Sequence, residues 1–118
     1  MKKLKPGFYI YILKCGDDSF YIGYTENLVT RLKYHYKGEG AIYTQKRQPV
    51  GLVFCLEFPT RDDALAAEKQ IKKWKRSKKI ALIEGDLELL RALSKNADLK
   101  PICLEEYLSK HGLENNLY

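Results

Sequence analysis

Two segments rich in aromatic and β-branched residues, separated by a short turn, constrain the fold of this chain most strongly. Residues 8–15 (FYIYILKC) and 20–24 (FYIGY) have the composition of strands, and residues 16–19 (GDDS) have that of a turn. Their spacing predicts an antiparallel hairpin. Because side chains alternate across a strand, we expect Tyr9 and Tyr11 on one face of the first strand.

The rest of the chain predicts helices around one further strand. We expect a helix from Thr25 or Asn27 to about Lys37, then a polar loop over residues 41–49. Residues 51–58 are nearly continuously apolar, which predicts a third strand buried in the centre of the sheet. Further helices are expected over residues 60–75 (with Thr60 as the N-cap), 78–84, 86–94 (with Leu87, Leu90 and Leu93 inward) and 104–110.

Length and composition indicate a single globular unit that binds a polyanion. The chain has 118 residues, of which 45% are hydrophobic and 31% charged. No apolar run approaches the roughly 20 residues of a membrane helix, so we expect no membrane contact and a cytoplasmic location. Three widely spaced cysteines argue against a disulfide framework or a zinc site. Residues 1–83 carry 17 basic and 8 acidic side chains, whereas residues 84–118 carry 4 and 7.

Five side chains in the basic part match what hydrolysis of a phosphodiester requires. Arg31 and His35 lie four residues apart in one predicted helix and therefore share a side of it. A guanidinium binds phosphate oxygens, and an imidazole can transfer a proton. Glu68 lies at the edge of the apolar stripe of the next long helix, and Mg²⁺ usually takes only one or two protein carboxylates. The hydroxyls of Tyr11 and Tyr21 can act on a water if nearby positive charge lowers their pKa.

Each of these side chains also has a purely structural interpretation. The tyrosines can be ordinary strand aromatics among the nine in the chain, and Arg31 can be a solvated helix residue. His35 can be a structural histidine, and Glu68 can pair with Lys72 one turn later. It is their joint order and spacing that favours a catalytic interpretation.

The motifs resemble those of the GIY-YIG nuclease superfamily, most closely its small bacterial members. The first motif stands as Tyr9-Ile10-Tyr11, with Tyr9 where the family name has Gly, and the second is intact as Tyr21-Ile22-Gly23. The resemblance covers about residues 8–85, and it continues through Asn27-Leu28, Arg31, His35, Gly40-Ala41, Tyr43-Thr44, Ala67-Glu68-Lys69 and Ile71-Lys72-Lys73-Trp74. The chain departs from the small members after residue 83, where it has Glu84-Gly85-Asp86-Leu87 in place of an Asn-Pro and a Trp.

The resemblance implies a fold of the α/β class in its α+β form, a small three-stranded antiparallel sheet flanked by helices. It also implies roles for five residues. Tyr11 would be the general base, Tyr21 would orient the water or a phosphate, and His35 would assist Tyr11. Arg31 would stabilise the phosphate. Glu68 would bind one divalent metal ion, Mg²⁺ or Mn²⁺.

We therefore expect a divalent-metal-dependent endonuclease that acts on DNA rather than RNA, is directed by DNA structure and is linked to repair or recombination. Residues 1–94 would form the nuclease domain, and residues 95–118 a helical C-terminal extension. Backbone contacts carry affinity but little sequence information. The candidates for contact with nucleic acid are Tyr9, Tyr43, Lys46, Arg47, Lys72, Lys73, Lys75 and Arg76.

Two other functions fit the same residues. The first is a nucleic-acid-binding module with little cleavage of its own, acting with a partner. The second is an interaction protein that docks through its Leu-rich segment from Leu87 to Leu108. The chain would be a monomer or a weak dimer, with the C-terminal extension as a possible protein contact.

Overall fold

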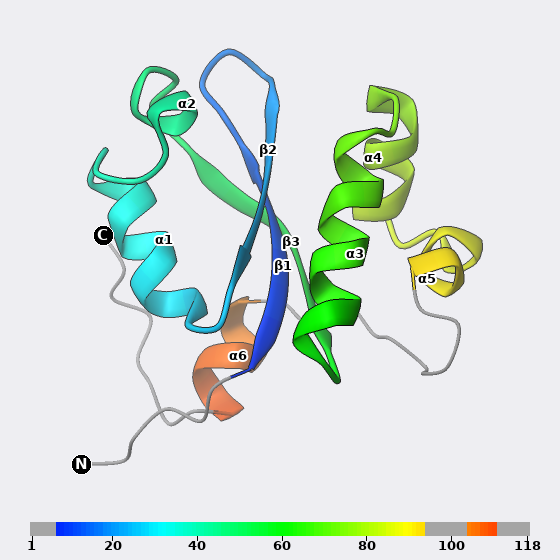
Figure 1. Cartoon of the computed structure of the whole chain (residues 1–118). Coiled ribbons are helices and arrows are strands. Elements are labelled where there is room, and N and C mark those ends of the chain that lie inside the picture. The colour runs from blue at the N-terminus through cyan, green and yellow to red at the C-terminus, as the bar shows by residue number, and fades with distance from the viewer. Residues whose placement is uncertain (1–6, 94–103, 111–118) are drawn as a thin grey trace.

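The computed structural model describes residues 7–93 and 104–110 and contains one three-stranded antiparallel sheet with helices on both faces (Figure 1). The strands are β1 (Phe8–Lys14), β2 (Phe20–Thr25) and β3 (Gly51–Phe58), in the order β2-β1-β3. The predicted hairpin is confirmed, with Tyr11 of β1 opposite Gly23 of β2. The α+β fold class is confirmed as well.

The prediction that β3 occupies the centre of the sheet was wrong. β1 pairs with both other strands, and β3 is an edge strand. The apolar run in β3 has another cause: helices cover both faces of the sheet, so an edge strand here also buries both of its faces. Hydrophobic content alone does not distinguish a central strand from an edge strand in such a layered fold.

Alternation along β1 divides the interior into two cores. Tyr9, Tyr11 and Leu13 pack on one side with helices α1 (Leu28–Tyr36) and α6 (Leu104–Lys110). Ile10 and Ile12 pack on the other side with α3 (Arg61–Lys72), so that α1 and α3 lie on opposite sides of the sheet (Figure 1). The shared face predicted for Tyr9 and Tyr11 is confirmed.

Side-chain caps begin the two long helices as predicted. Asn27 accepts a hydrogen bond from the Thr30 backbone N–H at 3.1 Å at the start of α1, and Thr60 accepts one from the Asp63 N–H at 3.1 Å at the start of α3. Helix α3 ends at Lys72, three residues before the predicted end at Lys75.

Two local predictions were wrong. Part of the predicted polar loop is a short helix, α2 (Ile42–Gln45). Two side chains hold it: Thr44 Oγ1 donates to the Ala41 carbonyl at 2.9 Å, and the side-chain amide of Gln45 donates to the Gly40 carbonyl at 2.8 Å. In α5 (Leu87–Leu93), Leu90 and Leu93 are buried but Leu87 is 64% exposed, because this first residue of the helix extends beyond the core. The remaining helix, α4 (Arg76–Ile83), begins two residues before its predicted start.

Helix α6 is part of the folded core. Tyr107 is 1% exposed and packs edge-on against Tyr9, with the ring centroids 5.2 Å apart, and Leu108 is buried beside it. Burial raises the pKa of the Tyr107 phenol, and hydrogen bonds with the backbone of Leu28 and Val29, at the start of α1, only partly oppose this shift. The predicted helix over residues 104–110 is confirmed, whereas the predicted domain boundary after residue 94 lies outside the described residues.

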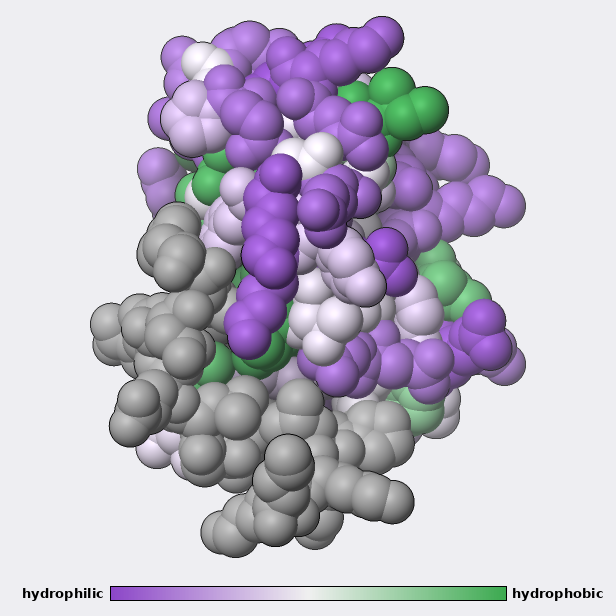
Figure 2. Space-filling view, turned by 90° about the vertical axis from the view of Figure 1, so that its left-hand side faces the viewer, coloured by the Kyte–Doolittle hydropathy of each residue, from purple (hydrophilic) through white to green (hydrophobic). Residues whose placement is uncertain are grey.

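The outer side of α1 and α2 is mainly hydrophilic, with small apolar areas between the polar side chains (Figure 2). Among the described helices, none has the length and apolar character needed to span a membrane.

Replacement of Tyr107 by alanine should destabilise the whole fold. Removal of a buried aromatic ring leaves a cavity beside Tyr9, and such losses amount to about 3–5 kcal/mol. Urea unfolding of Tyr107→Ala measures the change, with Tyr34→Ala as the matched control because the Tyr34 side chain is 50% exposed. A loss no larger than that of the control would show that α6 does not stabilise the sheet.

Candidate active site

The second tyrosine motif carries a glycine because Tyr11 occupies the space above it. Tyr11 and Gly23 are directly paired across β1 and β2, and a Cβ atom built on Gly23 would overlap the ring and hydroxyl of Tyr11. Glycine is therefore needed at position 23 because the Tyr11 ring approaches the backbone closely there. The absence of a side chain at Gly23 leaves room for the Tyr11 phenol to lie across the neighbouring strand.

Tyr11 and His35 form the centre of the site. Both are 1% exposed, and the Tyr11 hydroxyl lies 2.8 Å from His35 Nε2. Tyr11 comes from the central strand and His35 from α1, twenty-four residues later. The structure thus brings together two of the residues that the sequence predicted as catalytic.

The second nitrogen of His35 also has a partner. Its Nδ1 lies 2.9 Å from Oγ1 of Thr44, a fully buried residue of α2. In the sequence, Thr44 stands only within the matching Tyr43-Thr44 segment, and no role is predicted for it. Nothing in the sequence around Thr44 indicates that its hydroxyl contacts a histidine, so only the fold reveals this contact.

Two further residues hold this loop against His35. A Cβ atom on Gly40 would lie 2.5 Å from His35 Nδ1, so the backbone passes directly against the imidazole ring. The side-chain amide of Gln48 donates to the backbone carbonyls of His35 and Thr44, both at 2.9 Å. No role for Gln48 is predicted from the sequence.

Tyr21 and Tyr43 extend the aromatic cluster toward solvent. The Tyr21 ring lies 5.2 Å from His35 and 6.3 Å from Tyr11, measured between centroids, and it stacks with Tyr43 at 6.1 Å. Tyr43 is 37% exposed, and the Arg47 guanidinium lies 3.7 Å from the centre of its ring. A column of rings therefore runs from the surface to the buried Tyr11–His35 pair.

Burial controls the protonation of Tyr11 and His35. Burial raises the pKa of Tyr11 well above its ordinary value, Tyr21 and Glu68 raise it further, and the Arg31 charge only partly opposes them. The positive charge of Arg31 thus lowers the pKa of Tyr11 as expected, but burial outweighs it. Burial, assisted by the positive charge of Arg31, lowers the pKa of His35 to about 4, so that the imidazole is neutral near pH 7.

Arg31 and Glu68 act on the pair from two different helices. The charges of both influence the pKa of Tyr11, although Arg31 lies on α1 and Glu68 on α3. Arg31 is exposed, whereas the Glu68 side chain is 21% exposed and forms an ion pair with Lys72 Nζ at 3.4 Å. The pairing with Lys72 that the sequence allowed is thus present.

Glu68 fits the single-carboxylate kind of magnesium site. No cluster of three or more His, Cys, Asp or Glu side chains suited to a metal occurs among residues 7–93 or in the described part of α6. That donor set excludes a dedicated protein cage but suits Mg²⁺, which keeps several waters and binds one or two carboxylates together with substrate phosphate oxygens. The residue that would hold Mg²⁺ or Mn²⁺ is Glu68.

The predicted nucleic-acid contacts lie in different environments. The prediction that Tyr9 contacts nucleic acid was wrong. Its side chain is 1% exposed and packs on Tyr107 in the core, so it is not available to a nucleic acid. Arg76 is exposed, but its guanidinium already has partners within the protein: it donates to the Asp18 carbonyl and lies 4.5 Å from the centre of the Phe20 ring. Lys46, Lys73 and Lys75 are exposed, and no ion pair is seen for them within the described part of the chain.

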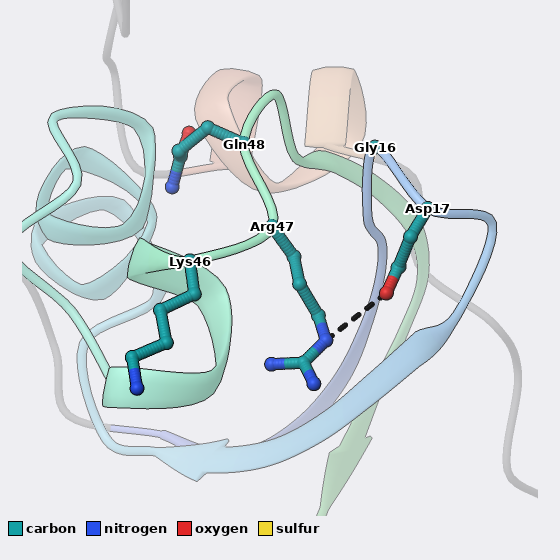
Figure 3. Close-up of a pocket in the computed structure, with 5 residues that line it drawn as sticks. All are labelled: Gly16, Asp17, Lys46, Arg47 and Gln48. Atoms are coloured by element: carbon teal, nitrogen blue, oxygen red, sulfur yellow. Dashed lines mark hydrogen bonds and ion pairs between the residues drawn. The ribbon is translucent and has the colours of Figure 1, made fainter.

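A cleft of about 420 Å³ opens where the β1–β2 turn meets the segment after α2 (Figure 3). It is lined by Gly16, Asp17, Lys46, Arg47 and Gln48. Arg47 reaches across it to Asp17, with Nε 3.0 Å from Oδ2 (Figure 3). The positive charge of Arg47, which was predicted to contact nucleic acid, is thus already compensated by the Asp17 carboxylate.

Replacement of Gly23 by alanine should displace Tyr11 and weaken the fold. The new methyl group overlaps a buried ring, and forced overpacking usually costs about 1–3 kcal/mol. Gly51→Ala is the matched control, because a Cβ there meets no atom within 4 Å. Equal urea midpoints for the two variants would contradict the close approach.

His35 should make stability depend on pH. Between its ordinary pKa of 6.5 and about 4, the unfolded chain binds a proton that the folded chain does not, so stability falls as the pH is lowered through this range. From pH 7 to pH 5 we expect a loss of about 1–2 kcal/mol that is missing in His35→Gln. Urea unfolding at both pH values measures it, and parallel losses in the two proteins would rule it out.

Comparisons with known proteins show the family of this chain. A family model described as the GIY-YIG catalytic domain matches residues 7–81. A UPF0213 protein from Pediococcus pentosaceus is 46% identical over 78 residues, which cover 66% of this chain and 82% of that protein. The UPF0213 protein YazA of Bacillus subtilis is 46% identical over 76 residues, covering 64% and 77%.

Two solution structures are also similar. A UPF0213 protein from Bacillus halodurans has 40% identity and a TM-score of 0.46, with 75% of this chain and 97% of that chain covered. A protein from E. faecalis has 38% identity and a TM-score of 0.49, with 71% and 88% covered. On the match to its family model and its curated relatives, this chain belongs to the GIY-YIG family of nuclease domains, among small members similar to the UPF0213 proteins.

Proposed function

We propose that this protein is a divalent-metal-dependent endonuclease that hydrolyses phosphodiester bonds in DNA. The observation that carries the proposal is the buried hydrogen bond between Tyr11 and His35, under the electrostatic influence of Arg31 and Glu68. A phenol in the core of a sheet needs no histidine at its hydroxyl for packing alone. Its connection to a neutral imidazole is the arrangement of a proton-transfer site.

The raised pKa of Tyr11 favours a relay through a neutral phenol over a preformed phenolate. The Tyr11 oxygen takes a proton from the attacking water while its own proton passes to His35 Nε2. With a pKa of about 4, His35 is a base of the same strength as an ordinary carboxylate, which serves widely as a general base. Tyr21, next to both rings, is placed to orient the water or a phosphate oxygen.

Negative charge that develops on the phosphate requires cationic partners. Arg31 is exposed and permanently charged, and its planar fork suits phosphate oxygens. When bound at Glu68, Mg²⁺ or Mn²⁺ would supply Lewis-acid stabilisation of the phosphate and of the leaving oxygen. The Glu68–Lys72 ion pair must open for that binding, and the released Lys72 then becomes free to meet a phosphate.

We propose DNA rather than RNA as the substrate, and the surface supports direction by DNA structure rather than by sequence. The exposed lysines suit backbone contacts, and none of the described elements resembles a dedicated reader of base edges. We further propose that the protein acts in DNA repair or recombination, in the cytoplasm, as a monomer or weak dimer. A protein contact through the C-terminal segment cannot use Tyr107 or Leu108, because both are buried in its own core.

One observation favours a binding module with little intrinsic cleavage as the second candidate. Glu68 is paired with Lys72 and Arg47 with Asp17, so both the metal ligand and one proposed phosphate contact are compensated internally. A partner that opens these pairs would then be needed for cleavage. Metal dependence distinguishes the two functions, since binding alone needs no divalent ion.

The decisive experiment is cleavage of end-labelled single-stranded, duplex, flap, fork and four-way-junction DNA with Mg²⁺, Mn²⁺ or EDTA. We expect metal-dependent cleavage that falls at least about 100-fold in Glu68→Gln and in Tyr11→Phe, because each variant removes a group that acts in the transition state. Glu88→Gln and Tyr34→Phe are matched controls on exposed positions of α5 and α1, and both should cleave like the wild type.

Binding of DNA without cleavage on every substrate, with equal affinity in Glu68→Gln, would replace the nuclease proposal with the binding module. Undiminished cleavage by Tyr11→Phe would show that another group activates the water.

A further inference from the structure

The hydrogen bonds around His35 determine which of its nitrogens carries the proton. Thr44 has one hydroxyl proton, and it donates that proton to the Ala41 carbonyl at 2.9 Å. Toward His35 Nδ1, also at 2.9 Å, Thr44 Oγ1 can therefore only accept. In this arrangement Nδ1 carries the proton, and in the neutral imidazole Nε2 is then bare and accepts the Tyr11 hydroxyl proton at 2.8 Å.

We propose that Thr44 is a positioning residue that sets the tautomer of His35 and thereby the direction in which the Tyr11 proton moves. The proposal rests on the nuclease function proposed above and adds a residue to it. In the opposite tautomer, Nε2–H would donate to the Tyr11 oxygen, and His35 would be unable to receive a proton from it. The side chains of Tyr11, His35 and Thr44 would then all be present, but in an arrangement that cannot pass the Tyr11 proton to His35.

The proton balance of the step shows why the tautomer matters. As the water oxygen bonds to phosphorus and the bond from phosphorus to the leaving oxygen breaks, one water proton goes to the Tyr11 oxygen and the Tyr11 proton goes to His35 Nε2. The imidazolium keeps its Nδ1–H on Thr44, so no hydroxyl has to turn. Afterwards His35 returns its proton to Tyr11, Tyr11 releases one to solvent, and the leaving oxygen takes one from solvent.

The surroundings keep Thr44 in place. It is fully buried in α2, and Gln48 ties its backbone carbonyl to that of His35. Gly40 allows the chain to pass against the imidazole ring, so the segment wraps closely around His35. A threonine that served only to fill space would not need its hydroxyl between a histidine nitrogen and a carbonyl.

The tautomer can be measured directly by NMR. In ¹⁵N-labelled full-length protein at pH 7, two-bond ¹H–¹⁵N correlations of the imidazole distinguish a protonated from a bare nitrogen. The chain has two histidines, His35 and His111, so a spectrum of His111→Gln assigns the signals. We expect a protonated Nδ1 in the wild type and in Thr44→Ser, and a shift toward protonated Nε2 in Thr44→Val, whose isosteric side chain cannot accept.

Cleavage provides the second measurement. Thr44→Val should lower kcat about 10–100-fold with KM unchanged, as is usual for partners that orient a catalytic imidazole, and Thr44→Ser should restore it. Thr30→Val, on the exposed surface of α1, is the matched control and should change neither measurement.

A protonated Nε2 in the wild type would overturn the proposal, and so would a Thr44→Val protein that keeps both the wild-type tautomer and the wild-type kcat. The wild-type spectrum decides the tautomer even if Thr44→Val does not fold. If the wild type cleaves no DNA but shows protonated Nδ1, the nuclease function fails while the tautomer assignment stands, and the proposed role of Thr44 in cleavage fails with the function.

Discussion

The burial of β1 on both faces is the constraint on which the rest of this structure depends. As the central strand it pairs with β2 and β3, and its alternating side chains supply both cores. Ile10 and Ile12 serve only packing against α3. Tyr9, Tyr11 and Leu13 face α1 and α6, so Tyr11, the proposed catalytic tyrosine, lies in the same row as two core residues. The position of the candidate site is therefore set by the central strand of the sheet, which suits a group proposed to hold a proton acceptor at a fixed distance.

The chemistry proposed for Tyr11 depends on contacts from several segments. Gly23 leaves room for its ring, the His35 imidazole lies at its hydroxyl, and the Tyr21 ring packs beside both. Arg31 and Glu68 act on it from helices on opposite sides of the sheet. The same burial that raises the pKa of Tyr11 lowers that of His35, which makes both groups neutral and favours a relay that needs no stable ion pair.

Local sequence patterns predicted much of the fold and the five catalytic candidates. The hairpin, the caps at Asn27 and Thr60 and the helix over residues 104–110 are confirmed, because each follows from turn chemistry, capping or periodicity within a short segment. The central position predicted for β3, the loop at α2 and the inward side of Leu87 were wrong. In each case the outcome depends on what covers the segment, which neighbouring residues in the sequence do not reveal.

The sequence by itself determined which residue types were available to a nuclease and the order in which the elements present them. Tertiary structure decided which of them meet. It buried Tyr9 against Tyr107, compensated Arg47 with Asp17, and placed Thr44 on the far nitrogen of His35. These outcomes depend on contacts between distant segments. The pKa of Tyr11 depends on them as well: it is raised rather than lowered, because burial outweighs the neighbouring charge of Arg31. Residue identity specifies what a side chain can do, whereas its partners and its exclusion from water specify what it does.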